Sequence, residues 1–156
     1  MDYRFNTATV QDIVGHLLLC DAYFSPPLSQ RIDLNEYAGK IVDKAERFEA
    51  WSQDALIGLV AIYCNDPQRE VTFISNVSVM PGWHGKGIGT RLLGQSIEYA
   101  RQQGFARILL EVASASAAAI SLYEKNDFLA IERSESLITM CLYLKNRESY
   151  EHRTQL

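Results

Sequence analysis

The chain lacks the composition that marks nucleic-acid-binding and membrane proteins. Its 15 lysine and arginine residues are outnumbered by 19 aspartate and glutamate residues, and the net charge of −4 provides no basic surface for nucleic acid or an anionic membrane. No apolar run is long enough to span a bilayer, and the opening Met1-Asp2-Tyr3-Arg4 does not read as a signal peptide. We therefore expect neither a nucleic-acid partner nor a membrane partner.

Cysteine is also scarce. Cys20, Cys64 and Cys141 are odd in number and show no metal-ligand spacing. This pattern favours reduced thiols in a cytoplasmic protein and predicts no metal site. The chain has no internal repeat and no low-complexity linker, and its 156 residues suffice for one domain with a buried core. We expect a single domain over residues 1–145, followed by a polar tail over 146–156.

The most informative stretch of the chain covers residues 79–90. A β-branched run, Val71–Val79, stops before Pro81, and three glycines then alternate with other residues before an amphipathic helix begins. Glycine permits unusual backbone angles, and the first N–H groups of a helix lack partners and lie at the positive end of its dipole. A strand–glycine loop–helix junction is therefore a candidate phosphate site. A tight turn without any ligand is the alternative.

Two common phosphate motifs do not fit this loop. A P-loop needs Ser or Thr after its lysine, whereas Lys86 is followed by Gly87. A dinucleotide fingerprint needs Gly-x-Gly-x-x-Gly within a βαβ unit, but the spacing here is one residue short and most expected strands precede the loop. The remaining interpretation is a pyrophosphate site of another kind.

Hydrophobic periodicity and turn residues predict the other elements. We expect strands at 3–8, 47–51, 56–64, Val71–Val79, 107–112, Leu129–Arg133 and 137–144, with 107–112 buried on both faces. We expect helices after a capping box at Thr9-Val10-Gln11-Asp12, around residues 34–45, from 88 to a C′ glycine at Gly104, and at 114–125. In the first of these helices, Ile13, Leu17 and Leu18 should share one buried face, and Ser25-Pro26-Pro27 should end it.

The loop and one later helix resemble the GNAT superfamily of acyl-CoA N-acyltransferases. The coenzyme A loop of that family reads Arg/Gln-x-x-Gly-x-Gly/Ala after a strand ending in Val-x-Pro. Here His84-Gly85-Lys86-Gly87-Ile88-Gly89 follows Val79-Met80-Pro81, with His84 in place of the usual Arg or Gln. Downstream, Ala119-Ile120-Ser121-Leu122-Tyr123-Glu124-Lys125 and Phe128 are similar to the family's Ala-x-x-Leu-Tyr-Glu-Lys-x-Gly-Phe helix.

The resemblance implies a fold and a cosubstrate. The fold would be α+β, with a mixed, mostly antiparallel sheet of about seven strands that splays after Val71–Val79 and is flanked by about four helices. The cosubstrate would be acetyl-CoA, with no metal. Its pantetheine would lie along the backbone of Val77, Ser78 and Val79 and reach Ser116, where the family usually has Asn. Its pyrophosphate would lie on the segment His84, Gly85, Lys86, Gly87, Ile88, Gly89 and Thr90.

Acetyl transfer to an amine raises the question of which groups move the protons. Tyr123 occupies the position at which the family often places a tyrosine hydroxyl near the coenzyme A sulfur. Glu111 precedes it by twelve residues, as does the base in the ribosomal-protein alanine acetyltransferase branch that this segment resembles. Alternatively, Asn76 and Ser75 could hold a water that relays the proton. The alternative for each residue is a structural role.

The acceptor is left open between a small-molecule amine and a protein N-terminus. The family places its acceptor site beside the early helices, so Tyr23, Phe24 and Tyr37 are candidate contacts, with core packing as the alternative. A homodimer is also left open. A non-catalytic acyl-CoA-binding module on the same fold is the rival interpretation, because fold alone does not give function. A nucleotide-phosphate-binding protein is a second rival.

Overall fold

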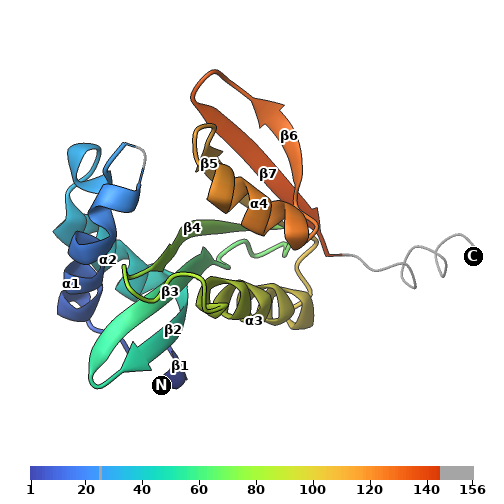
Figure 1. Ribbon diagram of the computed structural model, residues 1–156. Coiled ribbons are helices and arrows are strands. Elements are labelled where there is room, and N and C mark those ends of the chain that lie inside the picture. Colours follow the sequence, from blue (N-terminus) through green and yellow to red (C-terminus); the bar gives the residue numbers. More distant parts are fainter. Residues whose placement is uncertain (25, 145–156) are drawn as a thin grey trace, which may run out of the picture. The chain divides into compact units, whose positions relative to one another are not determined.

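The computed structural model describes residues 1–24 and 26–144, so the expected tail at 146–156 lies outside the described residues. The strands form a seven-stranded sheet in the order β1-β2-β3-β4-β5-β7-β6. They are β1 (Asp2–Phe5), β2 (Glu46–Ser52), β3 (Ala55–Tyr63), β4 (Val71–Val79), β5 (Arg107–Ala113), β6 (Leu129–Arg133) and β7 (Leu137–Tyr143). The α-helices of the described chain are α1 (Val10–Cys20), α2 (Leu34–Lys44), α3 (Ile88–Gln102) and α4 (Ala117–Lys125) (Figure 1). Two short 3₁₀ turns, η1 (Asp21–Tyr23) and η2 (Leu28–Gln30), lie between α1 and α2. The expected α+β fold, with a mostly antiparallel sheet, is confirmed.

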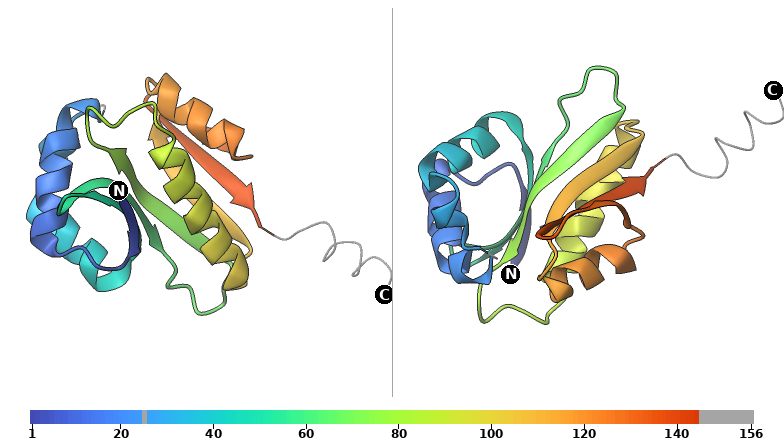
Figure 2. Two further views of the ribbon diagram at one scale, coloured as in Figure 1. Left: turned by 60° about the horizontal axis from the view of Figure 1, so that its bottom comes forward. Right: turned by 90° about the horizontal axis from the view of Figure 1, so that it is seen from above.

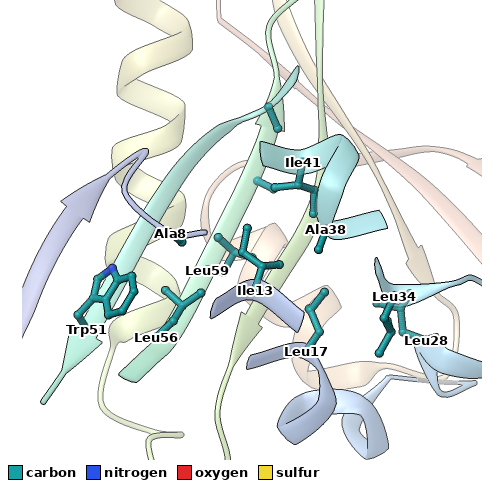
Figure 3. Close-up of a cluster of buried hydrophobic side chains, with 12 residues drawn as sticks. Ala8, Ile13, Leu17, Leu28, Leu34, Ala38, Ile41, Trp51, Leu56 and Leu59 are labelled. Atoms are coloured by element: carbon teal, nitrogen blue, oxygen red, sulfur yellow. The ribbon is translucent and has the colours of Figure 1, made fainter. Parts of the chain in front are cut away.

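The chain forms two compact units. The first comprises residues 1–63 and 74–96, and the second comprises 64–73 and the chain from 97 onward. In the first unit, β1, β2 and β3 pair in antiparallel fashion, and α1 and α2 pack together against β3 and β2 (Figures 1 and 2). Figure 3 shows the apolar core that they enclose. It includes Ala8, Ile13, Leu17, Leu28, Leu34, Ala38, Ile41, Trp51, Leu56 and Leu59.

Helix α1 begins as expected and buries Ile13 and Leu17 as expected, but not Leu18. Thr9 accepts a hydrogen bond from the Asp12 N–H, and the Asp12 carboxylate accepts one from the Thr9 N–H, so the predicted capping box is confirmed. Leu17 is fully buried, but the prediction for Leu18 is wrong because its side chain is 58% exposed. A residue follows its predecessor by about 100° around a helix, which carries Leu18 to the outer surface. His16 is buried instead.

A buried carboxylate shortens the first strand relative to the expected 3–8. Glu49 is fully buried and accepts hydrogen bonds from the Thr7 hydroxyl (2.6 Å), the Thr7 N–H (3.1 Å), the Ala8 N–H (2.9 Å) and Trp51 Nε1 (2.9 Å). The Nε of Arg47 lies 3.6 Å from the same carboxylate. The N–H groups that would continue β1 are therefore bound to a side chain, and the ladder ends.

The second unit contains the antiparallel order β5-β7-β6 and helix α4. The prediction that residues 107–112 are buried on both faces is wrong. Burial alternates along β5, with Leu110 and Val112 buried and Glu111 exposed opposite Thr139 of β7. Since alternate residues of a strand point to opposite faces, one face of β5 is less covered than the other. The apolar character of residues 107–112 did not show that the two faces of the strand differ in burial.

Particular hydrogen bonds set the helix boundaries in the second unit. Helix α4 begins at Ala117 rather than 114, because the Ser114 N–H donates to the Ser136 carbonyl at 3.0 Å and stays with the strands. The predicted C′ glycine is confirmed: Gly104 has φ +84°, and the Phe105 N–H returns to the Ala100 carbonyl at 3.1 Å.

Candidate active site

The loop between β4 and α3 has the backbone that its glycines predict. Gly85 and Gly87 have φ values of +75° and +77°, and Gly82 has φ +90°. A Cβ built on Gly85 or Gly87 would meet no atom within 4 Å. The positive φ therefore favours glycine at these positions, and the space beside the backbone is open. Gly89 differs from the other two motif glycines because it already lies in the first turn of α3.

The start of α3 presents N–H groups that the helix itself does not use. The Arg91 N–H donates to the Gly87 carbonyl at 3.0 Å. The N–H groups of Ile88, Gly89 and Thr90 precede that bond in the first turn, where a helix has no internal acceptor for them. The first turn carries no acidic residue, and Lys86 and Arg91 are exposed beside it. Orphan amides, the positive end of the helix dipole and two cations together suit a phosphate group.

His84 closes this loop onto the end of β4. Its Nε2 lies 2.7 Å from the Val79 carbonyl oxygen, to which it donates. The Tyr23 ring meets the His84 ring edge-on, with centroids 5.0 Å apart and planes at 90°. Tyr23 is 63% exposed, so it is not packed in the core, which was the alternative to an acceptor contact. His84 therefore orders the loop, and the Val79 carbonyl is already engaged by it.

Strand β4 carries a buried polar chain beside α1. Asn76 and Ser78 are 4% and 8% exposed, and the Asn76 Oδ1 and Ser78 Oγ atoms lie 2.7 Å apart. Ser78 Oγ lies 2.8 Å from His16 Nε2, and His16 Nδ1 lies 3.0 Å from the Leu56 carbonyl oxygen. Within the described chain, Asn76 Nδ2 is buried without a hydrogen-bond partner. Burial lowers the pKa of His16 to about 4, so its imidazole is neutral at pH 7.

Sequence reasoning missed His16. It found Asn76 and Ser78 from the strand, but the partner on α1 is sixty residues away in sequence. One signal was available, because His16 shares the i, i+3, i+4 spacing of Ile13, Leu17 and Cys20, which are buried on the same face.

Tyr37 of α2 and Ser75 of β4, two other candidate residues in the first unit, are joined by a hydrogen bond. The Tyr37 hydroxyl donates to the Ser75 carbonyl at 2.7 Å and lies 3.3 Å from Ser75 Oγ. Burial raises the pKa of the Tyr37 phenol, so it remains protonated at neutral pH. Phe24 packs at the border of the apolar core.

The catalytic candidates of the second unit differ in their surroundings. Tyr123 is 7% exposed, and its ring packs against Phe128 with centroids 5.9 Å apart. Burial raises the pKa of Tyr123 to about 12, so its hydroxyl is a neutral donor at pH 7. Glu111 is exposed on β5, and its carboxylate is therefore not desolvated. Ser116 precedes α4 without capping it through its side chain.

The described residues also bear on metal binding and on membrane insertion. They include no cluster of three or more histidine, cysteine or acidic side chains that could hold a metal ion. No helix among them combines the length and apolar character that a membrane span requires.

Comparisons with known proteins bear on the whole chain. The sequence profile of the Acetyltransferase (GNAT) family matches residues 12–128. An uncharacterized N-acetyltransferase of Methanocaldococcus jannaschii is 37% identical over 76 residues, which cover 46% of this chain and 34% of that protein. Across the curated relatives, the matched segments span 34% to 55% of the relative's own length.

Solved structures share the fold. The Escherichia coli ribosomal-protein-S18-alanine N-acetyltransferase aligns with a TM-score of 0.74 at 18% identity, covering 93% of this chain and 96% of that one. A Salmonella typhimurium protein solved with its cofactor acetyl-CoA aligns with a TM-score of 0.71 at 17% identity, covering 94% and 96%. The profile match spans most of the chain, and the architecture agrees with it. The chain therefore belongs to the GNAT family of acetyltransferases.

Proposed function

We propose that this protein transfers an acetyl group from acetyl-CoA to a primary amine, within a single GNAT-type domain over residues 1–145. The observation that carries the proposal is the β4–α3 junction. Two glycines with positive φ leave open space beside the backbone there, and the orphan amides of a helix start follow directly. This junction provides hydrogen-bond donors and positive charge without any competing carboxylate.

Acetyl-CoA would bind along this junction. Its pyrophosphate would accept from the amides of residues 85–90, with Lys86 adding charge. Its pantetheine would run beside the backbone of Val77, Ser78 and Val79 and reach Ser116, in the manner of an added strand. Because the Val79 carbonyl is engaged by His84, we assign His84 to holding the loop in its binding shape.

Tyr123 would stabilise the leaving thiolate as a hydrogen-bond donor. A thiol has a reference pKa of about 8.5, about 3.5 units below the value of about 12 at Tyr123. Complete proton transfer to the thiolate would therefore be uphill by about 5 kcal/mol. Donating a hydrogen bond while keeping the proton avoids this cost.

The amine must lose a proton, and two routes remain. An alkylammonium with a pKa of about 10.4 is only about 0.04% neutral at pH 7, a handicap of about 4.6 kcal/mol. Glu111 could accept the proton directly, since its carboxylate is exposed and available. Alternatively, a water held near Asn76 could relay it. The two routes differ in which substitution removes the activity.

The direct experiment is an amine panel that follows free thiol release from acetyl-CoA. It would contain a peptide with a free amino-terminal alanine, spermidine, an amino sugar and an aminoglycoside, since the acceptor class is open. Acetylation of at least one amine, with the product verified by mass spectrometry, supports the proposal. Tight acetyl-CoA binding without turnover on any amine would favour a non-catalytic acyl-CoA-binding module instead.

Location and assembly complete the proposal. Cys20, Cys64 and Cys141 are not joined by disulfides, which fits a reducing compartment, and we assign the protein to the cytoplasm. Sedimentation of the purified protein, with and without acetyl-CoA, would decide between a monomer and a homodimer.

A further inference from the structure

His16, Ser78 and Asn76 form a buried chain of hydrogen bonds. The number of protons on these groups determines which of them donates in each bond. The chain runs from the Leu56 carbonyl through His16 and Ser78 to the Asn76 amide, with steps of 3.0, 2.8 and 2.7 Å. All three side chains are more than nine-tenths buried, so their polar atoms must find hydrogen-bond partners within the protein and not in bulk water. Each short step must therefore contain one proton.

The first step fixes the histidine. A carbonyl oxygen only accepts, so the proton between His16 Nδ1 and the Leu56 oxygen belongs to Nδ1. A neutral imidazole has a single N–H, and burial keeps His16 neutral at pH 7. His16 Nε2 is therefore an acceptor, and the proton in the 2.8 Å step comes from the Ser78 hydroxyl. The Cys20 sulfur, 3.7 Å from Nε2, adds at most a second weak donor.

The second step fixes the amide. Ser78 has one hydroxyl proton, and it is used on His16, so Ser78 Oγ must accept from Asn76. The atom 2.7 Å from Ser78 Oγ is then Nδ2. The two ends of an asparagine amide have the same shape, and a half-turn of the group exchanges them. This half-turn lets Nδ2 donate one of its two N–H bonds to Ser78 and places Oδ1 in the buried position that had no hydrogen-bond partner. Asn76 thus presents a buried acceptor oxygen that needs a donor.

We infer that His16 is a positioning residue that acts through Ser78 to hold Asn76 Oδ1 as a hydrogen-bond acceptor for the amine substrate. The inference rests on the proposed function for its choice of donor. The thioester group of acetyl-CoA has no N–H or O–H to donate, whereas a neutral primary amine has two N–H bonds. The Tyr37 hydroxyl lies close enough to interact with the Asn76 side chain, but its proton is directed to the Ser75 carbonyl at 2.7 Å. An amide oxygen is too weak a base to take the proton, so Asn76 orients the amine and leaves deprotonation to another group.

The direction of the chain can be tested without any substrate. Nitrogen-15 NMR of the ligand-free protein distinguishes the two neutral histidine tautomers by the shifts of the ring nitrogens. We expect His16, assigned by its absence in His16→Gln, to be in the Nδ1–H form between pH 6 and 8. The Nε2–H tautomer or a charged imidazolium in that range would overturn the inference.

The role in amine binding can be tested with two matched substitutions. Glutamine places its carbonyl oxygen near the former Nε2 and still accepts from Ser78. Asparagine places its amide nitrogen near the former Nδ1 and keeps only the bond to the Leu56 carbonyl. We expect His16→Asn to raise the amine KM about tenfold and His16→Gln to raise it less than threefold. The acetyl-CoA KM should stay within twofold for both, and thermal melting should show that both fold.

Spermidine and a peptide with a free amino-terminal alanine would be the amine probes. Equal effects of the two variants, or an effect on the acetyl-CoA KM instead, would overturn the inference; the second result would point to the pantetheine N–H groups as the donors. If no amine is acetylated by the wild-type protein, the proposed function fails and the amine assignment fails with it. The tautomer measurement would still decide the direction of the chain.

Discussion

The buried His16 makes a quantitative prediction about stability and pH. Burial holds its folded-state pKa at about 4, while the unfolded chain has the usual value of 6.5. Between pH 4 and 6.5, the His16 imidazole therefore binds a proton in the unfolded state but not in the folded state. The difference of about 2.5 units corresponds to about 3 kcal/mol of unfolding free energy. This stability is fully present above pH 6.5 and is lost as the pH falls from 6.5 to 4.

The measurement is a series of urea unfolding curves at pH 7, 6, 5 and 4.5, followed by tryptophan fluorescence. Carboxylates also titrate near the acid end, so the informative quantity is the difference between the wild type and His16→Gln, which shares every other group. The wild-type free energy should fall more steeply, by up to about 1.4 kcal/mol per pH unit near the middle of the range. Parallel curves for the two proteins would refute the assignment of a buried neutral imidazole.

Four further substitutions test the roles of Tyr123, Glu111, Asn76 and Glu49. Tyr123→Phe should lower kcat about ten- to a thousandfold with little change in acetyl-CoA affinity, and unchanged turnover would reduce Tyr123 to a packing residue. Glu111→Gln should abolish most activity at neutral pH and recover toward high pH if Glu111 is the base. A loss of kcat at saturating amine in Asn76→Ala alone would assign the proton to a water relay, whereas the orienting role of Asn76 predicts a rise in the amine KM. Glu49→Gln should lower the unfolding free energy by about 3 kcal/mol in urea titrations, because it leaves Arg47 without its charge partner and turns an N–H group toward other donors. An unfolding free energy within 0.5 kcal/mol of wild type would contradict that reading of the carboxylate.

Local patterns predicted the elements whose causes are local. The capping box at Thr9, the bounds of β4 and the C′ glycine at Gly104 each depend on residues within a few positions of one another. The same holds for the positive φ at Gly85 and Gly87. Such features follow from backbone sterics and from the orphan groups at helix ends, which the sequence displays directly.

Tertiary partners decided the features that sequence missed. Leu18 is as apolar as Leu17, and only the position of β3 against α1 determines which of them is buried. The end of β1 depends on the Glu49 carboxylate, which lies more than forty residues later in the chain. His16 gained its role from Ser78 in the same way. Helical spacing indicates that His16 is buried, but long-range hydrogen bonds leave no periodic signal, so a single sequence does not reveal its partner.

The backbone at the start of α3 is the proposed binding site of acetyl-CoA, and its charge preference can be measured directly. Isothermal titration with acetyl-CoA should give saturable binding to the wild type and to Gly94→Asp, which adds the same side chain at an exposed helical position with open space around it. Gly87→Asn and Gly87→Asp share the same backbone strain and nearly the same size, but only the second adds a negative charge. The aspartate variant should bind at least about tenfold more weakly than the asparagine variant, since like charges about 4 Å apart repel by about 1–4 kcal/mol. A folded Gly87→Asp protein that binds acetyl-CoA as tightly as the wild type would contradict the account.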